Sequence, residues 1–102
     1  MLDGAILTRA KMPACSAAGA NFTGATLVDA FMRSAGFEGA NFTGAILLGA
    51  DVGRARFAKA ILFGADMRAS ELADADLRGA VADRSTRWPV AFEPESHGVI
   101  LR

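Results

Sequence analysis

The 102-residue chain carries 11 basic and 11 acidic residues, so its formal net charge is zero, which argues against a basic surface that binds nucleic acid directly. Hydrophobic residues make up 52% of the chain, but no apolar run approaches the ~20 residues that cross a bilayer. The one cysteine cannot form an internal disulfide, and the first residues lack the basic-then-apolar layout of a signal peptide. We therefore expect a cytoplasmic protein without membrane contact.

A five-residue period begins near the first residue. From Ala5 to Ala80 every fifth residue is alanine, except Cys15 and Ser70. Two positions after it stands a large apolar residue, which we call the centre of the repeat. These centres are Leu7, Met12, Phe22, Leu27, Met32, Phe37, Phe42, Leu47, Val52, Phe57, Leu62, Met67, Leu72 and Leu77. A period of five fits neither the 3.6 of a helix nor the 2.0 of a flat strand, so it predicts a solenoid that turns a corner every five residues.

The sequence also has a longer repeat of twenty residues. The segment 19–25 returns unchanged as segment 39–45. Since twenty is four fives, four repeats would make one square coil, with residues twenty apart stacked roughly 4.7–4.9 Å apart. This predicts about four coils. It also stacks Phe22 on Phe42 and Phe37 on Phe57, and we expect these two pairs on opposite faces.

Alanine, then Asn or Asp, then a large apolar residue, is the pattern at 20–22, 40–42, 65–67 and 75–77. This pattern resembles the signature of the pentapeptide-repeat family, over residues 1–84. The resemblance implies an all-β fold, a right-handed quadrilateral β-helix, in which the alanine and centre side chains point inward.

The period stops after Arg84. In the segment that follows, prolines break strand ladders and large apolar residues offer a hydrophobic plug. We predict that residues 85–102 form a capping tail over the last coil, with Trp88, Pro89 and Phe92 as its capping residues. The segment is also similar to the tail that follows many pentapeptide arrays.

The other end has no comparable segment, because Met1 and Leu2 already lie in the register of the repeat. A bare first coil would expose strand edges and core side chains. A homodimer through the N-terminal coil is one expectation.

Residues suited to catalysis are scarce. Cys15 occupies an inward alanine position, where a small buried thiol is expected rather than a nucleophile. His97 is the only histidine and lies in the tail without a second ligand at metal spacing. The chain has no tyrosine. We predict no enzyme activity, no cofactor and no metal site.

Large apolar side chains also fall at outward positions of two adjoining faces. They are Ile6, Val28, Ile46 and Leu48 on one face, and Ile61, Phe63 and Val81 on the next. An apolar patch of this kind marks a protein or homodimer interface, unless the tail folds back over it near Ile61 and Phe63. Phe31 stands apart on a third face, as an isolated surface aromatic or a contact point.

These observations favour a non-enzymatic scaffold or protein-interaction module whose partner protein is unidentified. The alternative, from the resemblance, is a DNA-mimic inhibitor of a type II topoisomerase such as gyrase. Mimicry requires a long acidic surface, whereas five acids between Asp66 and Asp83 are interleaved with Arg68 and Arg78. A fragment, or an array engineered for its fold, is the third possibility.

Overall fold

The corners of the chain are β-turns of a repeated kind. In this computed structural model, which describes residues 3–69 and 71–102, the turn at Phe22 is typical. The Ala25 amide donates to the Phe22 carbonyl at 2.9 Å, and Gly24, the third residue of the turn, has φ +68°. A positive φ is free of steric cost only for glycine. Several other corners nevertheless place a longer residue there, among them Arg9 and Lys59.

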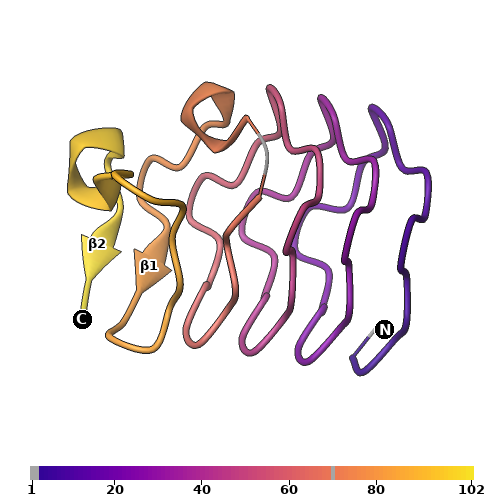
Figure 1. Cartoon of the computed structure of the whole chain (residues 1–102), viewed down its shortest axis with the longest axis horizontal. Helices are drawn as coiled ribbons and strands as arrows, with labels where there is room; N and C mark the ends of the chain where they lie inside the picture. The colour runs from indigo at the N-terminus through magenta and orange to yellow at the C-terminus, as the bar shows by residue number, and fades with distance from the viewer. Residues whose placement is uncertain (1–2, 70) are drawn as a thin grey trace.

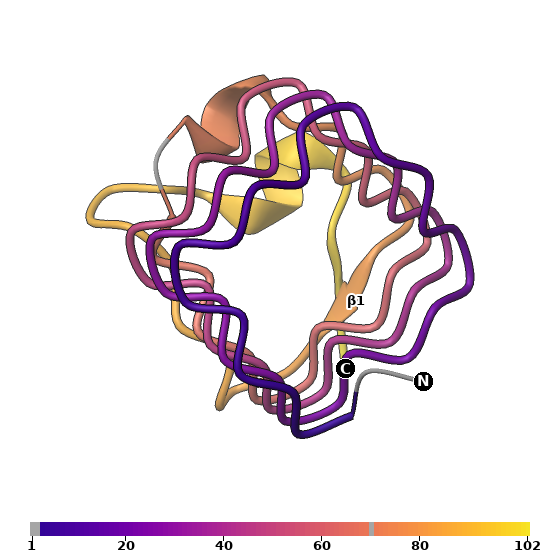
Figure 2. The ribbon, with the colours of Figure 1, turned by 90° about the vertical axis from the view of Figure 1, so that its right-hand side faces the viewer.

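The sides between the corners pair with residues about twenty positions away. Parallel β-bridges form four ladders, and the chain seen end-on has a four-sided outline (Figure 2). The ladders are Ile6–Thr26–Ile46–Asp66–Arg87, Lys11–Phe31–Asp51, Ser16–Gly36–Arg56–Asp76 and Asn21–Asn41–Ile61–Val81, the last continued to Ile100. Because a side is only a few residues long, regular strands in the part of the chain that the structure describes are confined to β1 (Val81–Ala82) and β2 (Ile100–Leu101). The predicted twenty-residue stacking is therefore the organising contact of the fold (Figure 1).

We name the four faces by the centre residues behind them and the layers by residue ranges. Face 1 has Phe22, Phe42, Leu62 and Ala82; face 2 has Leu7, Leu27, Leu47 and Met67; face 3 has Met12, Met32, Val52 and Leu72; face 4 has Ala17, Phe37, Phe57 and Leu77. Layers 1 to 4 are residues 5–24, 25–44, 45–64 and 65–84.

The core is a column of centre residues and alanines, completely buried through layers 2 and 3. The phenylalanine arrangement corrects the expectation from sequence, because the two pairs lie on adjacent faces and not on opposite ones. Phe22 and Phe42 stack with ring centroids 4.9 Å apart, and Phe37 meets Phe42 edge-to-face at 5.3 Å. Residues 37 and 42 are consecutive centres separated by a single corner. The four rings, Phe57 included, therefore form one continuous cluster with both favoured aromatic geometries.

Layer 4 departs from the pattern on face 3. A short 3-10 helix, η1 (Leu72–Asp74), stands in place of the next bridge after Asp51, and it bulges outward from the four-sided outline (Figure 2). Its N-cap residue Glu71 has φ +63°. Leu72 still reaches the core with 2% exposure, so the departure changes the outer surface and keeps the centre column.

The tail after Arg84 makes a further, irregular turn of the stack. Arg87 pairs with Asp66, and β2 pairs in parallel with β1. A second 3-10 helix, η2 (Pro94–His97), lies between these two contacts at the end of the stack (Figure 1). The tail is locked in place at Thr86, whose hydroxyl donates to the Leu62 carbonyl at 2.8 Å.

Candidate functional site

The outward apolar residues lie on faces 1 and 2. Three of the residues that the sequence singled out are strongly exposed: Ile6 at 81%, Ile46 at 39% and Leu48 at 42%. The others are half-buried: Val28, Ile61, Phe63 and Val81. Ile6 and Ile46 belong to one bridge ladder, with Thr26 between them. The structure therefore brings exposed apolar side chains together on face 2, and we call Ile6, Val28, Ile46 and Leu48 the face 2 patch.

The start of the tail runs beside the corner that follows Phe63. The Gly64 amide donates to the Asp83 carboxylate at 3.1 Å, and the Ser85 hydroxyl donates to the same oxygen at 2.8 Å. These contacts place the tail along face 1, while Ile46 and Leu48 keep their exposure on face 2. Of the seven residues that the sequence singled out on faces 1 and 2, the strongly exposed ones thus lie on face 2, while Ile100 and Leu101 of β2, beside Val81, are 45% and 44% exposed.

The predicted capping residues lie at the end of the core. Trp88 and Phe92 are partly buried against the core cluster, and their rings stack with centroids 5.5 Å apart. Pro89 between them is half-buried. His97 stacks on Phe92 at 4.5 Å, which gives the only histidine a packing role in the tail.

Three of the acids between Asp66 and Asp83 are held by hydrogen bonds. The Arg68 guanidinium lies 2.7 Å from the Asp66 carboxylate, and Arg78 lies 3.0 Å from that of Asp76. Hydrogen bonds from these arginine side chains lower the pKa of Asp66 and of Asp76, and the Ser85 hydroxyl lowers the pKa of Asp83. Paired acids do not form the continuous negative surface that DNA mimicry requires.

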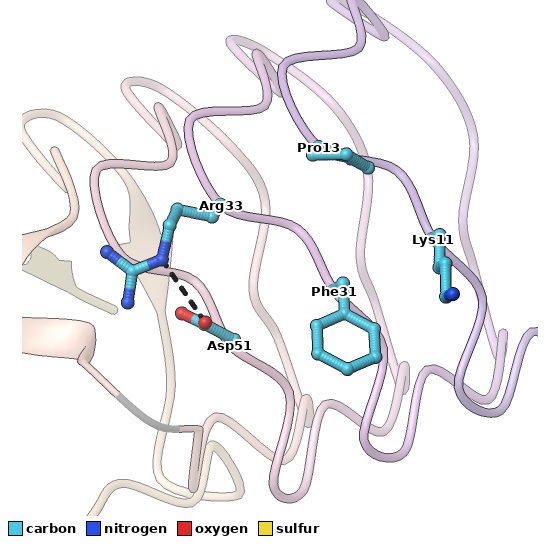
Figure 3. A pocket seen from close by; sticks show the side chains of 5 residues that line it. All are labelled: Lys11, Pro13, Phe31, Arg33 and Asp51. Carbon is cyan, nitrogen blue, oxygen red and sulfur yellow. Dashed lines mark hydrogen bonds and ion pairs between the residues drawn. The ribbon is translucent and has the colours of Figure 1, made fainter.

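A depression of about 400 Å³ opens on face 3 (Figure 3). It is lined by Lys11, Pro13, Phe31, Arg33 and Asp51. The Phe31 ring is 48% exposed, and the Arg33 Nε lies 3.2 Å from an Asp51 carboxylate oxygen. The ladder thus sets a cation, an aromatic ring and a carboxylate in one row. The sequence left Phe31 open as an isolated surface aromatic or a contact point, and the twenty-residue spacing of positions 11, 31 and 51 already indicated that these three residues lie in one row.

Gly53 borders this surface, and sequence reasoning did not single it out. A Cβ atom at Gly53 would lie 2.8 Å from Nη1 of Arg33 and 2.9 Å from its Cζ. The guanidinium therefore lies against the backbone of the next layer, where a side chain would displace it. Its orientation toward Asp51 depends on that space.

Other kinds of site are absent from the described residues. Within residues 3–69 and 71–102 no three His, Cys, Asp or Glu side chains gather as metal ligands. The same part of the chain has no helix that is long and apolar enough to cross a membrane. Cys15 is half-buried at its core position in layer 1.

A family model for pentapeptide repeats matches residues 2–37, 20–58 and 35–72, with eight copies. The chain belongs to the pentapeptide-repeat family. No curated protein matches it. Family membership thus agrees with the five-residue period and with the ladders, and it names no partner or substrate.

Several solved pentapeptide-repeat proteins are similar to this one. The alr5209 protein from Nostoc Pcc 7120 is 28% identical, with a TM-score of 0.51 over 95% of this chain and 84% of that one. Rfr23 from the cyanobacterium Cyanothece 51142 is 23% identical, with a TM-score of 0.47 over 78% of this chain and 64% of that one. AT2G44920 from the Arabidopsis thaliana thylakoid lumen is 30% identical, with a TM-score of 0.39 over 86% of this chain and 62% of that one.

Proposed function

We propose that this pentapeptide-repeat protein is a rigid protein-interaction module that acts by binding and carries out no catalysis. The observation that carries the proposal is the face 2 patch, where Ile46 and Leu48 are 39% and 42% exposed on one side of one layer. Contiguous exposed apolar side chains on a small protein are a feature of interaction surfaces. The partner is a protein that offers a complementary apolar strip.

We infer that the scaffold behind this surface is a right-handed quadrilateral β-helix of about four coils, closed at one end by the tail. Family membership and the four parallel ladders support this inference. In such a scaffold the backbone hydrogen bonds fix the positions of the outward side chains before any partner binds. Preorganised side chains lose little conformational entropy on association, which favours binding.

Self-association is a second form that the same interaction could take. The face 2 patch of one copy would meet that of another, or the first layers of two copies would meet. In layer 1 the centre residues Leu7 and Met12 are half-buried, whereas their counterparts in layer 2 are fully buried. Light scattering over a wide concentration range tests this form, and a constant monomer mass would contradict it.

Affinity capture with matched variants tests the partner proposal. Leu48 and Ala58 hold the same place of the repeat in layer 3, on opposite faces 2 and 4. Leu48→Glu should remove bound proteins because it puts a charge in the apolar strip, and Phe63→Glu tests whether the surface continues onto face 1. Ala58→Glu adds the same charge elsewhere and should leave binding unchanged. Recovery of the same proteins with Leu48→Glu and Ala58→Glu would show that the face 2 patch is not the binding surface.

A further inference from the structure

The charged residues at the two ends of face 3 have opposite signs. Layer 1 contributes the basic residue Lys11, and the fourth layer contributes the acidic residues Glu71 and Asp74 at the helix η1. Between them, Arg33 of layer 2 is paired with Asp51 of layer 3, and layer 3 adds the basic residue Arg54 at its corner. The face is thus positive at its layer 1 end and negative at its layer 4 end.

The charges at the two ends of this face are unpaired. Among the residues that the structure describes, Lys11, Glu71 and Asp74 form no ion pair, and all three are exposed. The ends are therefore free to bind opposite charges from outside the chain. A surface that is positive at one end and negative at the other is complementary to itself when one copy is turned end for end.

We propose that face 3 binds a second copy of this chain, related by a two-fold axis perpendicular to the face between layers 2 and 3. This operation reverses both the stack and the direction of each side, so it matches layer 1 with layer 4 and layer 2 with layer 3. Lys11 then meets the second copy's Asp74, and each such contact occurs twice, as in any isologous interface. This proposal does not depend on the face 2 patch.

The same operation brings the centre of face 3 into register. Phe31, before the centre of layer 2, falls opposite the second copy's Gly53, after the centre of layer 3. Gly53 has no side chain, and the Arg33 guanidinium lies over it. The Phe31 ring can therefore lie against the guanidinium of the other copy, a cation–π contact. Arg33 likewise falls opposite the second copy's Asp51, so each existing ion pair can be shared across the interface.

The size of the face sets the expected strength. The molecule measures 28 × 22 × 22 Å, so one side of it buries less than the ~800 Å² per partner of a standard interface. We expect a weak dimer. Because the two ends of the interface depend on attraction between exposed charges, which salt screens, raising the salt concentration to about 0.5 M should dissociate the dimer.

Sedimentation equilibrium of the full chain over a concentration series tests the proposal. Lys11→Glu and Asp74→Lys should each weaken the dimer at least about tenfold, since each places like charges at both ends of the interface. Mixing the two variants should restore dimers, because both end contacts then pair opposite charges. Lys59→Glu, at an exposed corner of face 4, is the matched control and should leave the dimer unchanged.

The proposal would be overturned by a monomer at every concentration, by failure of the mixed variants to form dimers, or by an equal effect of Lys59→Glu. A dimer lost with Leu48→Glu and kept with Lys11→Glu would place self-association on face 2, and so would also overturn it. Circular dichroism of each variant checks that these exposed substitutions leave the fold intact. The capture experiment with Leu48→Glu is read independently, so failure of either proposal leaves the other standing.

Discussion

At the level of single residues, backbone conformation at the corners has a direct energetic cost. The third residue of most turns takes a positive φ, and about half of these positions hold glycine while others hold Arg, Lys, Asp, Ser or Ala. For a residue with a Cβ atom this conformation costs roughly 1–2 kcal/mol. The chain therefore keeps several strained corners, and they are compensated by burial and by the ladders.

Gly44→Ala isolates that cost. Gly44 has φ +69°, and a Cβ atom there would meet no atom within 4 Å, so only the conformation changes. We expect the free energy of unfolding to fall by about 1–2 kcal/mol, measured by urea denaturation. The reverse change Ala14→Gly, at φ +56°, should relieve strain and stabilise slightly, after the ~0.4–1 kcal/mol entropy cost of an added glycine. Equal stabilities of Gly44→Ala and the parent would contradict this account of the corners.

Asp66 predicts how stability depends on pH. Its hydrogen bond from the Arg68 side chain lowers its pKa below the ordinary 3.8. A carboxyl whose pKa is lower in the folded state stabilises the fold above its unfolded pKa, and this contribution is lost as the pH falls from about 4 through the folded value. Asp66→Asn should therefore reduce stability at neutral pH and flatten its decline below about pH 4. Urea titrations across this range measure the slope, and unchanged slopes would show that the pair contributes nothing.

At the level of elements, the ladders depend on each side meeting the layer before and after it. The fold departs from this at η1 and in the tail, where Arg87 and Ile100 pair 21 and 19 residues from their partners instead of 20. Thr86 sits where the register changes. Its hydroxyl donates to the Leu62 carbonyl and accepts from the Asp83 amide at 3.1 Å. A buried hydroxyl thus holds the tail to layer 3 at the point where the register changes.

Thr86→Val should destabilise the attachment of the tail. The substitution keeps the shape of the side chain and leaves the Leu62 carbonyl and the Asp83 amide without this partner, at a cost of about 1–3 kcal/mol. Thr86→Ser keeps the hydroxyl and should cost less. Hydrogen exchange at the amides of Ile100 in β2 and of Arg102 directly after it, which donate to the Ala80 and Ala82 carbonyls, reports the loosening. Equal effects of the two variants would assign the role of Thr86 to packing.

At the level of the whole molecule, charge and length bear on the DNA-mimic alternative. A duplex as long as the 28 Å dimension of the molecule carries about 16 phosphate charges. The chain has 11 acidic residues in all, balanced by 11 basic ones. We therefore expect no inhibition of gyrase supercoiling at micromolar protein. Inhibition at that concentration, lost with Asp74→Lys, would favour mimicry over a simple interaction module.

Much of this molecule was predictable from local spacing. Alanine every fifth residue and a centre two places later gave the inward columns, because a corner at each repeat returns the same side chain to the interior. The return of segment 19–25 as segment 39–45 predicted that residues twenty positions apart stack on each other. The error over the phenylalanines had a simple cause: Phe37 and Phe42 follow each other across one corner, and their faces were assigned without tracing the order of the corners.

The sequence by itself determined the repeat, the family and the columns of buried residues, since all three follow from periods of five and twenty along the chain. Only the tertiary structure decided which outward residues stay open and which charges are paired. Exposure of Leu48, the space over Gly53 and the bulge of η1 depend on contacts between layers and with the tail. Such contacts join residues about twenty or more positions apart, where a one-residue change in register alters every neighbour.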